Sequence, residues 1–116
     1  MMYNIARGGD IVAIQLTVNL LDACVLAALN KQDMYGYILT QEIKKAMDIS
    51  ESTLYPVLRR LQREEYLTIY DEAVMGRNRR YYRITDKGKE RLAEYINEWD
   101  EYVKGVNSLL KGEDEK

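Results

Sequence analysis

One stretch, residues 48–67, constrains the fold of this chain more than any other. Apolar side chains recur in it at the spacing of one helical face, at Leu54, Val57, Leu58 and Leu61. This spacing predicts an amphipathic α-helix whose apolar face packs against a core. The opposite face is cationic and rich in hydrogen-bond donors. Taken by itself, such a helix is most often a solvated surface helix, so its neighbours along the chain decide its role.

A second, shorter helix is predicted immediately before it, over about Tyr37–Met47. Residues 48–50 leave room only for a tight turn between the two helices, and Ser50 or Ser52 can cap the second one. Two short helices joined in this way form a helix-turn-helix. Pro56 lies beyond the first helical turn and removes one backbone hydrogen bond, so we expect a bent or loosely wound start of the helix.

A β-hairpin is predicted directly after the helix. Residues 67–70 and 79–84 alternate in polarity, and residues 72–78 between them include Gly76 and Asn78 for a turn. One face of the hairpin then carries apolar side chains and the other carries arginines, with Arg77 at the tip. The inward set is Leu67, Ile69, Tyr82 and Ile84, and the outward set is Arg79, Tyr81 and Arg83. A helix-turn-helix followed by such a hairpin predicts a winged helix.

Positive charge is concentrated in this predicted winged helix. The net charge is −2 overall, but residues 1–49 carry −1, residues 50–91 carry +3 and residues 92–116 carry −4. Residues 77–91 alone carry +5. A nucleic-acid backbone responds to such a local patch rather than to the total charge.

Two longer helices flank the winged helix. Asp10 can cap a helix of about residues 10–29, which is apolar on nearly all sides and therefore needs cover from a second subunit as well as from its own core. Thr85 can cap a last helix of about residues 86–110, whose apolar residues follow the heptad spacing of a dimerisation helix. The predicted fold is mainly α with a small β-hairpin, divided into a flexible N-terminal arm (1–9), a winged helix-turn-helix domain (10–85), a C-terminal dimerisation helix (86–111) and a disordered tail (112–116).

Composition argues against several classes of protein. The chain has no histidine and one cysteine, Cys24, so no metal site, cofactor or disulfide framework is predicted. It has no phosphate-binding glycine loop, and its scattered carboxylates fit charged helix faces rather than an enzyme active site. Asp22 argues against a membrane span, at a cost of about 2.5–3.5 kcal/mol. We therefore expect a cytoplasmic protein without a membrane segment or catalytic activity.

Three blocks of sequence occur in a characteristic order: Tyr35-Gly36-Tyr37, residues 51–61 (ESTLYPVLRRL) and residues 76–85 (GRNRRYYRIT), followed by Gly88. With them, the chain resembles the PadR family of bacterial winged-helix transcriptional regulators over about residues 20–110. Its single C-terminal helix is similar to the family's short branch. The family usually has glycine where this chain has Glu65. Glu avoids the left-handed conformation that glycine accepts, so this turn is where the chain departs from the family pattern.

The predicted DNA site is the outward face of the helix within residues 48–67, together with the wing. In a helix-turn-helix the N-terminal half of the second helix enters the major groove, where hydroxyls and one arginine can reach base edges or phosphates. The other arginines suit phosphates, which give affinity but little sequence information. Tyr55 and Tyr82 suit packing equally well. The predicted DNA-binding residues are Tyr37, Ser52, Thr53, Tyr55, Arg59, Arg60, Arg63, Arg77, Arg79, Arg80 and Arg83.

The predicted dimer interface combines the first and last helices, with Trp99, the only tryptophan, at its centre. Two interpretations of Trp99 are open: a hydrophobic anchor, or a ring that stacks on a planar effector, as the resemblance implies. Asp22 either faces the same cavity and favours cationic ligands or is a half-exposed side chain. The predicted effector residues are Trp99, Asp22, Tyr95 and Tyr102, and the predicted interface residues are Ile14, Val18, Leu21, Leu92, Ile96, Trp99, Val103, Val106 and Leu110.

The function expected from the sequence is therefore that of a sequence-specific regulator that binds double-stranded DNA. We expect a homodimeric repressor whose binding is released or modulated by a small aromatic effector between the subunits. Two alternatives are a winged-helix module that binds a protein partner, and a DNA-binding regulator without an effector, in which Trp99 is purely structural.

Overall fold

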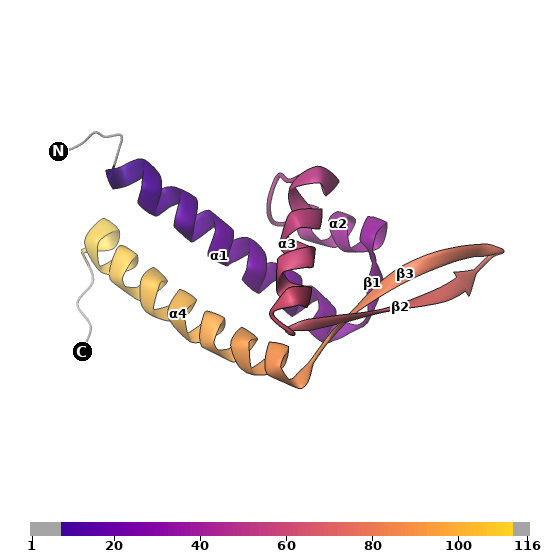
Figure 1. Cartoon of the computed structure of the whole chain (residues 1–116). Helices are drawn as coiled ribbons and strands as arrows, with labels where there is room; N and C mark the ends of the chain where they lie inside the picture. The colour runs from indigo at the N-terminus through magenta and orange to yellow at the C-terminus, as the bar shows by residue number, and fades with distance from the viewer. Residues whose placement is uncertain (1–7, 113–116) are drawn as a thin grey trace.

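The structure is a computed structural model that describes residues 8–112 and, within this range, the side chains from residue 20 onward. Four helices and a three-stranded antiparallel sheet of order β1-β3-β2 make up this part of the chain (Figure 1). They confirm the predicted winged helix-turn-helix, mainly α with a small β-hairpin. The elements are α1 (Gly8–Lys31), β1 (Met34–Tyr35), α2 (Gly36–Lys44), α3 (Glu51–Arg63), β2 (Leu67–Val74), β3 (Arg77–Ile84) and α4 (Asp86–Lys111).

The two flanking helices project from the same side of the winged helix. α1 and α4 run antiparallel and contact each other, which makes the described chain elongated, with extents of 55 × 33 × 25 Å (Figure 1). The described part of α1 already includes Gly8 and Gly9, which were predicted to belong to the N-terminal arm. The rest of the predicted N-terminal arm and most of the predicted tail lie outside the described residues. Between residues 8 and 112, no helix is long and apolar enough to cross a membrane.

The core lies where α1, α2, α3, α4 and the sheet meet. Leu54, Leu58 and Leu61 of α3 are fully buried, as their spacing predicted, and each contributes about 1.5–3 kcal/mol of transfer free energy. Val57 is only partly buried, at the edge of the core. This packing fixes α3 with its polar face outward. The buried apolar residues are Leu21, Val25, Leu26, Ala28, Leu29, Met34, Leu39, Ile43, Leu54, Leu58, Leu61, Leu67, Tyr82, Ile84, Leu92 and Tyr95.

The start of α3 is held by a serine cap. The Ser50 hydroxyl accepts a hydrogen bond from the Thr53 backbone N–H at 3.3 Å, which satisfies one of the free donors at the helix start. The helix runs unbroken through Pro56, so the loosely wound start that the sequence predicted does not form. Because proline has no N–H, the Ser52 carbonyl is the group that loses its helical partner.

The end of α3 is a left-handed turn at Glu65. The Tyr66 N–H donates to the Leu61 carbonyl and the Glu65 N–H donates to the Gln62 carbonyl, both at 2.9 Å. This pair of bonds is the Schellman motif, whose left-handed position is usually glycine. Glu65 has a φ of 68°, so the chain adopts the geometry of a glycine turn with a side chain that disfavours it, at roughly 1–2 kcal/mol.

The same turn fastens α3 to the start of α4. The Thr85 N–H donates to the Tyr66 carbonyl at 3.0 Å, and the Thr85 hydroxyl donates to the Glu65 carbonyl at 2.8 Å. Lys87 Nζ donates to the Glu64 carbonyl at 3.1 Å. Gly88 lies so close to the Tyr66 carbonyl that a Cβ there would collide with backbone. The C-terminal end of α3 is thus joined to the N-terminal end of α4.

The wing is longer and its turn tighter than predicted. β2 and β3 have eight residues each and pair without a gap from Leu67 opposite Ile84 to Val74 opposite Arg77. The predicted seven-residue connection is therefore wrong, because its charged residues pair across the strands instead of forming a loop. Met75 and Gly76 make the turn with φ values of 52° and 79°, the signs that a type I′ turn requires.

Candidate nucleic-acid interface

The outward face of α3 presents four of the six α3 residues predicted to contact DNA. Ser52, Thr53, Arg59 and Arg63 are all exposed. Tyr55 is half-buried, and its ring packs directly against Gly36 at the start of α2, where a Cβ would collide with the Tyr55 hydroxyl. Tyr55 therefore joins the two helices of the helix-turn-helix while its edge stays accessible.

Arg60 is turned away from this face. Its Nη2 donates to Asp22 Oδ1 at 2.6 Å, and this hydrogen bond raises the pKa of the arginine further above its usual value. Asp22 is 2% exposed and also accepts a hydrogen bond from the Tyr95 hydroxyl at 3.3 Å. The alternative of a half-exposed Asp22 is wrong, since α3 and α4 supply partners that bury it. Arg60, predicted to bind phosphate, ties α3 to α1 through a side chain that is 30% exposed.

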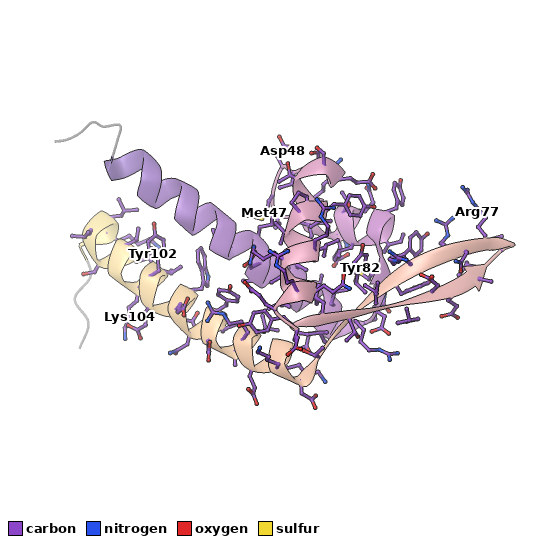
Figure 2. The ribbon with its side chains drawn as sticks, viewed as in Figure 1. Met47, Asp48, Arg77, Tyr82, Tyr102 and Lys104 are labelled. Atoms are coloured by element: carbon purple, nitrogen blue, oxygen red, sulfur yellow. The ribbon has the colours of Figure 1, made fainter. Side chains whose placement is uncertain are left out.

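A polar cleft opens between the wing and the first turns of α2 and α3. We call it the wing cleft; its volume is about 490 Å³. It combines aromatic hydroxyls with arginines, and the predicted residues Tyr37, Tyr55, Arg79 and Arg80 all contribute to it. Figure 2 shows Tyr82 at the base of the wing and Arg77 near its far end. The lining residues are Tyr35, Gly36, Tyr37, Glu51, Tyr55, Asp71, Asn78, Arg79, Arg80 and Tyr82.

The outward face of the sheet carries a row of stacked aromatic rings that the sequence did not predict. Tyr81 stacks on Tyr70 with ring centroids 5.4 Å apart and meets Tyr35 edge-on at 5.5 Å. The Arg79 guanidinium lies 4.4 Å from the Tyr35 ring centre and that of Arg83 lies 4.8 Å from the Tyr70 ring centre. Arg79 and Arg83 therefore stiffen the wing through cation–π contacts as well as adding charge to it.

Asp33 secures the base of this row. Its Oδ2 accepts hydrogen bonds from the Tyr70 hydroxyl at 2.7 Å and from Arg83 Nε at 3.0 Å. The bond to Asp33 raises the pKa of Tyr70, so the hydroxyl remains a donor at neutral pH. The two-residue strand β1 adds the third ring by pairing Tyr35 with Tyr81. A strand this short leaves no alternation in the sequence, which is why it was not predicted.

The predicted arginines differ in how freely they can meet an anion. Arg80 Nε lies 3.3 Å from Asp71 Oδ1 across the strands, and Arg60 is paired with Asp22. In the part of the chain that the structure describes, no acidic oxygen lies within 4.0 Å of the remaining α3 arginines or of the wing tip. Of the predicted arginines, Arg59, Arg63, Arg77 and Arg79 have no such partner among the described residues.

A second, apolar cavity lies between α1 and α4, far from the wing. We call it the tryptophan pocket; its volume is about 450 Å³. Trp99, which is 44% exposed, and Tyr102 line it with ring centroids 6.1 Å apart, and Tyr95 forms part of its wall. Three of the four predicted effector residues thus meet in it, whereas Asp22 lies behind Tyr95. Its lining is Leu20, Ala23, Cys24, Ala27, Ala46, Met47, Leu92, Tyr95, Ile96, Glu98, Trp99 and Tyr102.

The residues predicted for a dimer interface fall into three groups. Ile14 and Val18 lie outside the described side chains. Leu21 and Leu92 are buried in the chain's own core, so they pack within one chain rather than at its surface. The residues that remain on the surface or only half-buried follow one side of α4, and Leu109 and Tyr102 extend this side. They are Ile96, Trp99, Val103, Val106 and Leu110.

Comparison with known proteins identifies the family. A family model described as the transcriptional regulator PadR-like family matches residues 25–94. The chain belongs to the PadR-like family. Transcriptional regulator Rv3488 of Mycobacterium tuberculosis is 36% identical to this PadR-like chain over 75 residues, which cover 64% of this chain and 70% of the relative.

Solved structures agree with this assignment. The Streptococcus mutans protein smu.1704 has a TM-score of 0.79 and 36% identity, with 85% of this chain and 93% of that chain covered. A PadR-like transcriptional regulator from Bacillus cereus has a TM-score of 0.78 and 36% identity, covering 85% and 99% of the two chains. A PadR family regulator from Clostridium difficile has a TM-score of 0.73 and 28% identity, covering 78% and 97%.

As a PadR-like protein, the chain is a DNA-binding transcriptional regulator. The family model and the solved neighbours from Bacillus cereus and Clostridium difficile are described as transcriptional regulators. Within the described residues, no group of three or more histidine, cysteine or carboxylate side chains is placed to hold a metal ion. Among the described residues, the wing cleft and the exposed face of α3 each carry cations and hydroxyls together.

Proposed function

We propose that the protein is a homodimeric repressor that binds a pseudo-palindromic operator and is modulated by a planar aromatic ligand. The proposed DNA binding rests on one observation, which is that the polar face of α3 and the wing cleft form a continuous surface. The exposed polar face of α3 leads directly into the wing cleft, so a major-groove reader and a phosphate-binding wall lie side by side.

Roles on this surface follow from exposure and chemistry. Ser52 and Thr53 lie in the first turn of α3, where short hydroxyl side chains can reach base edges. Arg59 lies nearly two helical turns (about 3.6 residues each) further on, exposed and without an acidic partner among the described residues, and it suits either guanine or phosphate. Arg80 and Tyr37 face the wing cleft and suit the phosphate backbone that passes it.

The exposed apolar side of α4 is the evidence for the proposed homodimer. Ile96, Trp99, Tyr102 and Leu109 are between 44% and 86% exposed, although they are large and apolar. A contiguous patch of this kind marks an interface. Two chains joined through it would present two α3 helices to successive major grooves, roughly 34–36 Å apart on the operator.

The tryptophan pocket is the evidence for the proposed ligand. It is lined by Trp99 and Tyr102, whose flat rings favour a planar aromatic molecule, and Glu98 at its edge favours a cationic one. Because the pocket adjoins the proposed interface, a bound ligand would change how the two subunits meet. That change would shift the population of dimers whose α3 helices match the operator spacing.

The DNA role is tested by binding a duplex at several salt concentrations. Arg59→Ala and Arg80→Ala should each weaken binding, and a lost phosphate contact should lower the slope of log affinity against log salt by about 0.9. Lys111→Ala at the far end of α4 is the matched control, because it removes one cation that is remote from the wing. Equal effects of all three substitutions would contradict the proposed surface.

The ligand role is tested with a planar cationic dye, proflavine. Trp99 is the only tryptophan and Cys24 the only cysteine, and both line the tryptophan pocket. We expect the dye to quench tryptophan fluorescence, to slow alkylation of Cys24 and to lower the affinity for DNA. Quenching without protection of Cys24 would place the dye elsewhere, and unchanged DNA affinity would leave the pocket without a regulatory role.

A further inference from the structure

The Asp22 carboxylate of α1 lies between the tryptophan pocket and α3 and accepts a hydrogen bond from a residue of each. We propose that Tyr95, Asp22 and Arg60 form a relay that transmits occupancy of the tryptophan pocket to α3. This inference rests on the proposed DNA binding and ligand binding, and it names the side chains that couple one to the other.

Both oxygens of Asp22 are engaged, by partners from two different helices. Oδ1 accepts a hydrogen bond from Arg60 Nη2 of α3 at 2.6 Å, and Oδ2 accepts one from the Tyr95 hydroxyl of α4 at 3.3 Å. Asp22 is 2% exposed, so water cannot readily replace a partner that leaves. A buried carboxylate that loses one partner therefore turns to the partner that remains.

Tyr95 belongs both to the wall of the tryptophan pocket and to this buried network. Burial raises the pKa of Tyr95, so its hydroxyl stays protonated and donates at neutral pH. Its bond to Asp22, at 3.3 Å, is longer than the usual O–H···O distance of about 2.5–3.0 Å. A planar ligand that stacks on the Tyr95 ring therefore needs to displace the ring only slightly to break this bond.

A cationic ligand would act on Tyr95 by a second route. The Arg91 guanidinium lies 3.9 Å from the centre of the Tyr95 ring, a cation–π contact that holds the ring in place. Arg91 Nη1 is paired with Glu94 at 2.6 Å and, at 3.6 Å, with Glu98, which lines the pocket. A cation in the pocket competes with Arg91 for Glu98, and this competition loosens the contact on the ring. The relay thus favours planar ligands that carry positive charge.

Arg60 converts the loss of the Tyr95 bond into a movement of α3. Its side chain is partly exposed and its Nη1 lies 3.8 Å from Glu64 Oε1, so the guanidinium is shared between the buried Asp22 and the surface. Without Tyr95, Oδ2 of Asp22 is free to join Oδ1 in a bidentate pair with the guanidinium, which draws Nη1 away from Glu64 and α3 toward α1. Arg59 directly precedes Arg60, so the same movement shifts a side chain proposed to meet DNA.

Tyr95→Phe separates the relay from both binding sites. Phenylalanine keeps the ring in the pocket wall and removes only the hydroxyl that reaches Asp22. Tyr102→Phe is the matched control, because it removes a hydroxyl from the same pocket at a residue outside the relay. By linkage, the factor by which a ligand weakens DNA binding equals the factor by which DNA weakens ligand binding, so one coupling factor describes each protein.

The first measurement is the coupling factor between proflavine and DNA in the full-length proteins. Each protein is titrated with a duplex that wild type selects from a randomised library, with and without saturating proflavine, and the dye that intercalates into free duplex is corrected for. We expect proflavine to weaken DNA binding about tenfold in wild type and Tyr102→Phe but less than about twofold in Tyr95→Phe. Without dye, the DNA affinities of wild type and Tyr95→Phe should agree within about twofold, and so should their proflavine affinities measured by Trp99 quenching.

The second measurement needs no DNA. The NMR signal of the Arg60 guanidinium, assigned by its absence from the spectrum of Arg60→Lys, should shift when proflavine binds to wild type or to Tyr102→Phe. In Tyr95→Phe the same signal should stay in place, although the dye still quenches Trp99. A Tyr95 hydroxyl that only stabilised the fold would leave this dye-induced shift intact in Tyr95→Phe.

The outcomes distinguish failure of the relay from failure of the proposed function. Equal coupling factors in wild type and Tyr95→Phe would overturn the relay alone, and so would equal losses of coupling in both variants. A dye that quenches Trp99 without moving the Arg60 signal of wild type would overturn it as well. Wild type that selects no duplex, or whose Trp99 is not quenched by proflavine, would overturn the proposed function and the relay with it.

Discussion

The buried ion pair between Asp22 and Arg60 gives a prediction about stability that depends on which partner is removed. Asp22 is 2% exposed, whereas the Arg60 side chain is 30% exposed and has Glu64 within 3.8 Å as a second partner. Arg60→Met keeps the apolar stem but leaves the Asp22 carboxylate buried without its cation. Asp22→Asn leaves an arginine that can turn to water and to Glu64.

These geometries set the expected magnitudes. Removing one partner of a buried pair costs about 3–5 kcal/mol, and the partial exposure of Arg60 lowers this to about 2–3 kcal/mol for Arg60→Met. Asp22→Asn should cost about 1 kcal/mol, because the amide can still accept the Tyr95 hydrogen bond. The double variant should be more stable than Arg60→Met alone by about 1 kcal/mol, since the uncompensated charge is gone.

Urea unfolding at one fixed protein concentration measures all four proteins of this cycle, because dimerisation would otherwise shift the midpoints. The urea concentration at the unfolding midpoint should fall by about 1–2 M for Arg60→Met and by less than about 1 M for Asp22→Asn. Equal losses for the two single variants, or a double variant whose loss is the sum of both, would refute the assignment of Asp22 as the buried member that needs its partner.

Three further predictions concern the turn after α3 and the tryptophan pocket. Glu65→Gly should raise the free energy of unfolding by about 1 kcal/mol in the same assay, because glycine accepts the φ of 68°; no gain would contradict strain at this turn. Gly88→Ala should lower it by about 1–3 kcal/mol, since the new Cβ would meet the Tyr66 carbonyl, and a neutral result would mean that the turn and α4 can separate. Burial raises the pKa of Cys24, so alkylation by iodoacetamide should be slow at pH 8 and should level off at a higher pH than for free cysteine measured alongside; a plateau at the same pH as free cysteine, or lower, would contradict this burial.

The sequence predicted the fold well because its signals were long and periodic. The apolar stripe of α3 and the alternation in the wing each span several residues, and both faces came out as their spacing indicated. The prediction was weakest where a few residues decide the geometry. β1 has two residues, and the Met75-Gly76 turn shortened the predicted connection by pairing charged residues that looked like a loop.

The candidate site was predictable in composition but not in pairing. Exposed α3 residues such as Arg59 could be identified from the helical face that they occupy. That Arg60 turns inward depends on Asp22, which is 38 residues away along the chain and invisible to any local pattern. The tyrosine row is similar, since Tyr35, Tyr70 and Tyr81 meet only through the strand register.

The fastening of α3 to the start of α4 has a mechanical consequence. α4 has 26 residues and is therefore about 39 Å long, with its exposed apolar side along the C-terminal half and the turn at Glu65 and Tyr66 at the N-terminal end. A helix held in this way acts as a lever arm. Tilting it by about 5° at the far end would swing the α3 end by about 3 Å, close to the rise of one base pair. Very small adjustments where two subunits touch would thus be magnified into a misfit of one base step at the DNA.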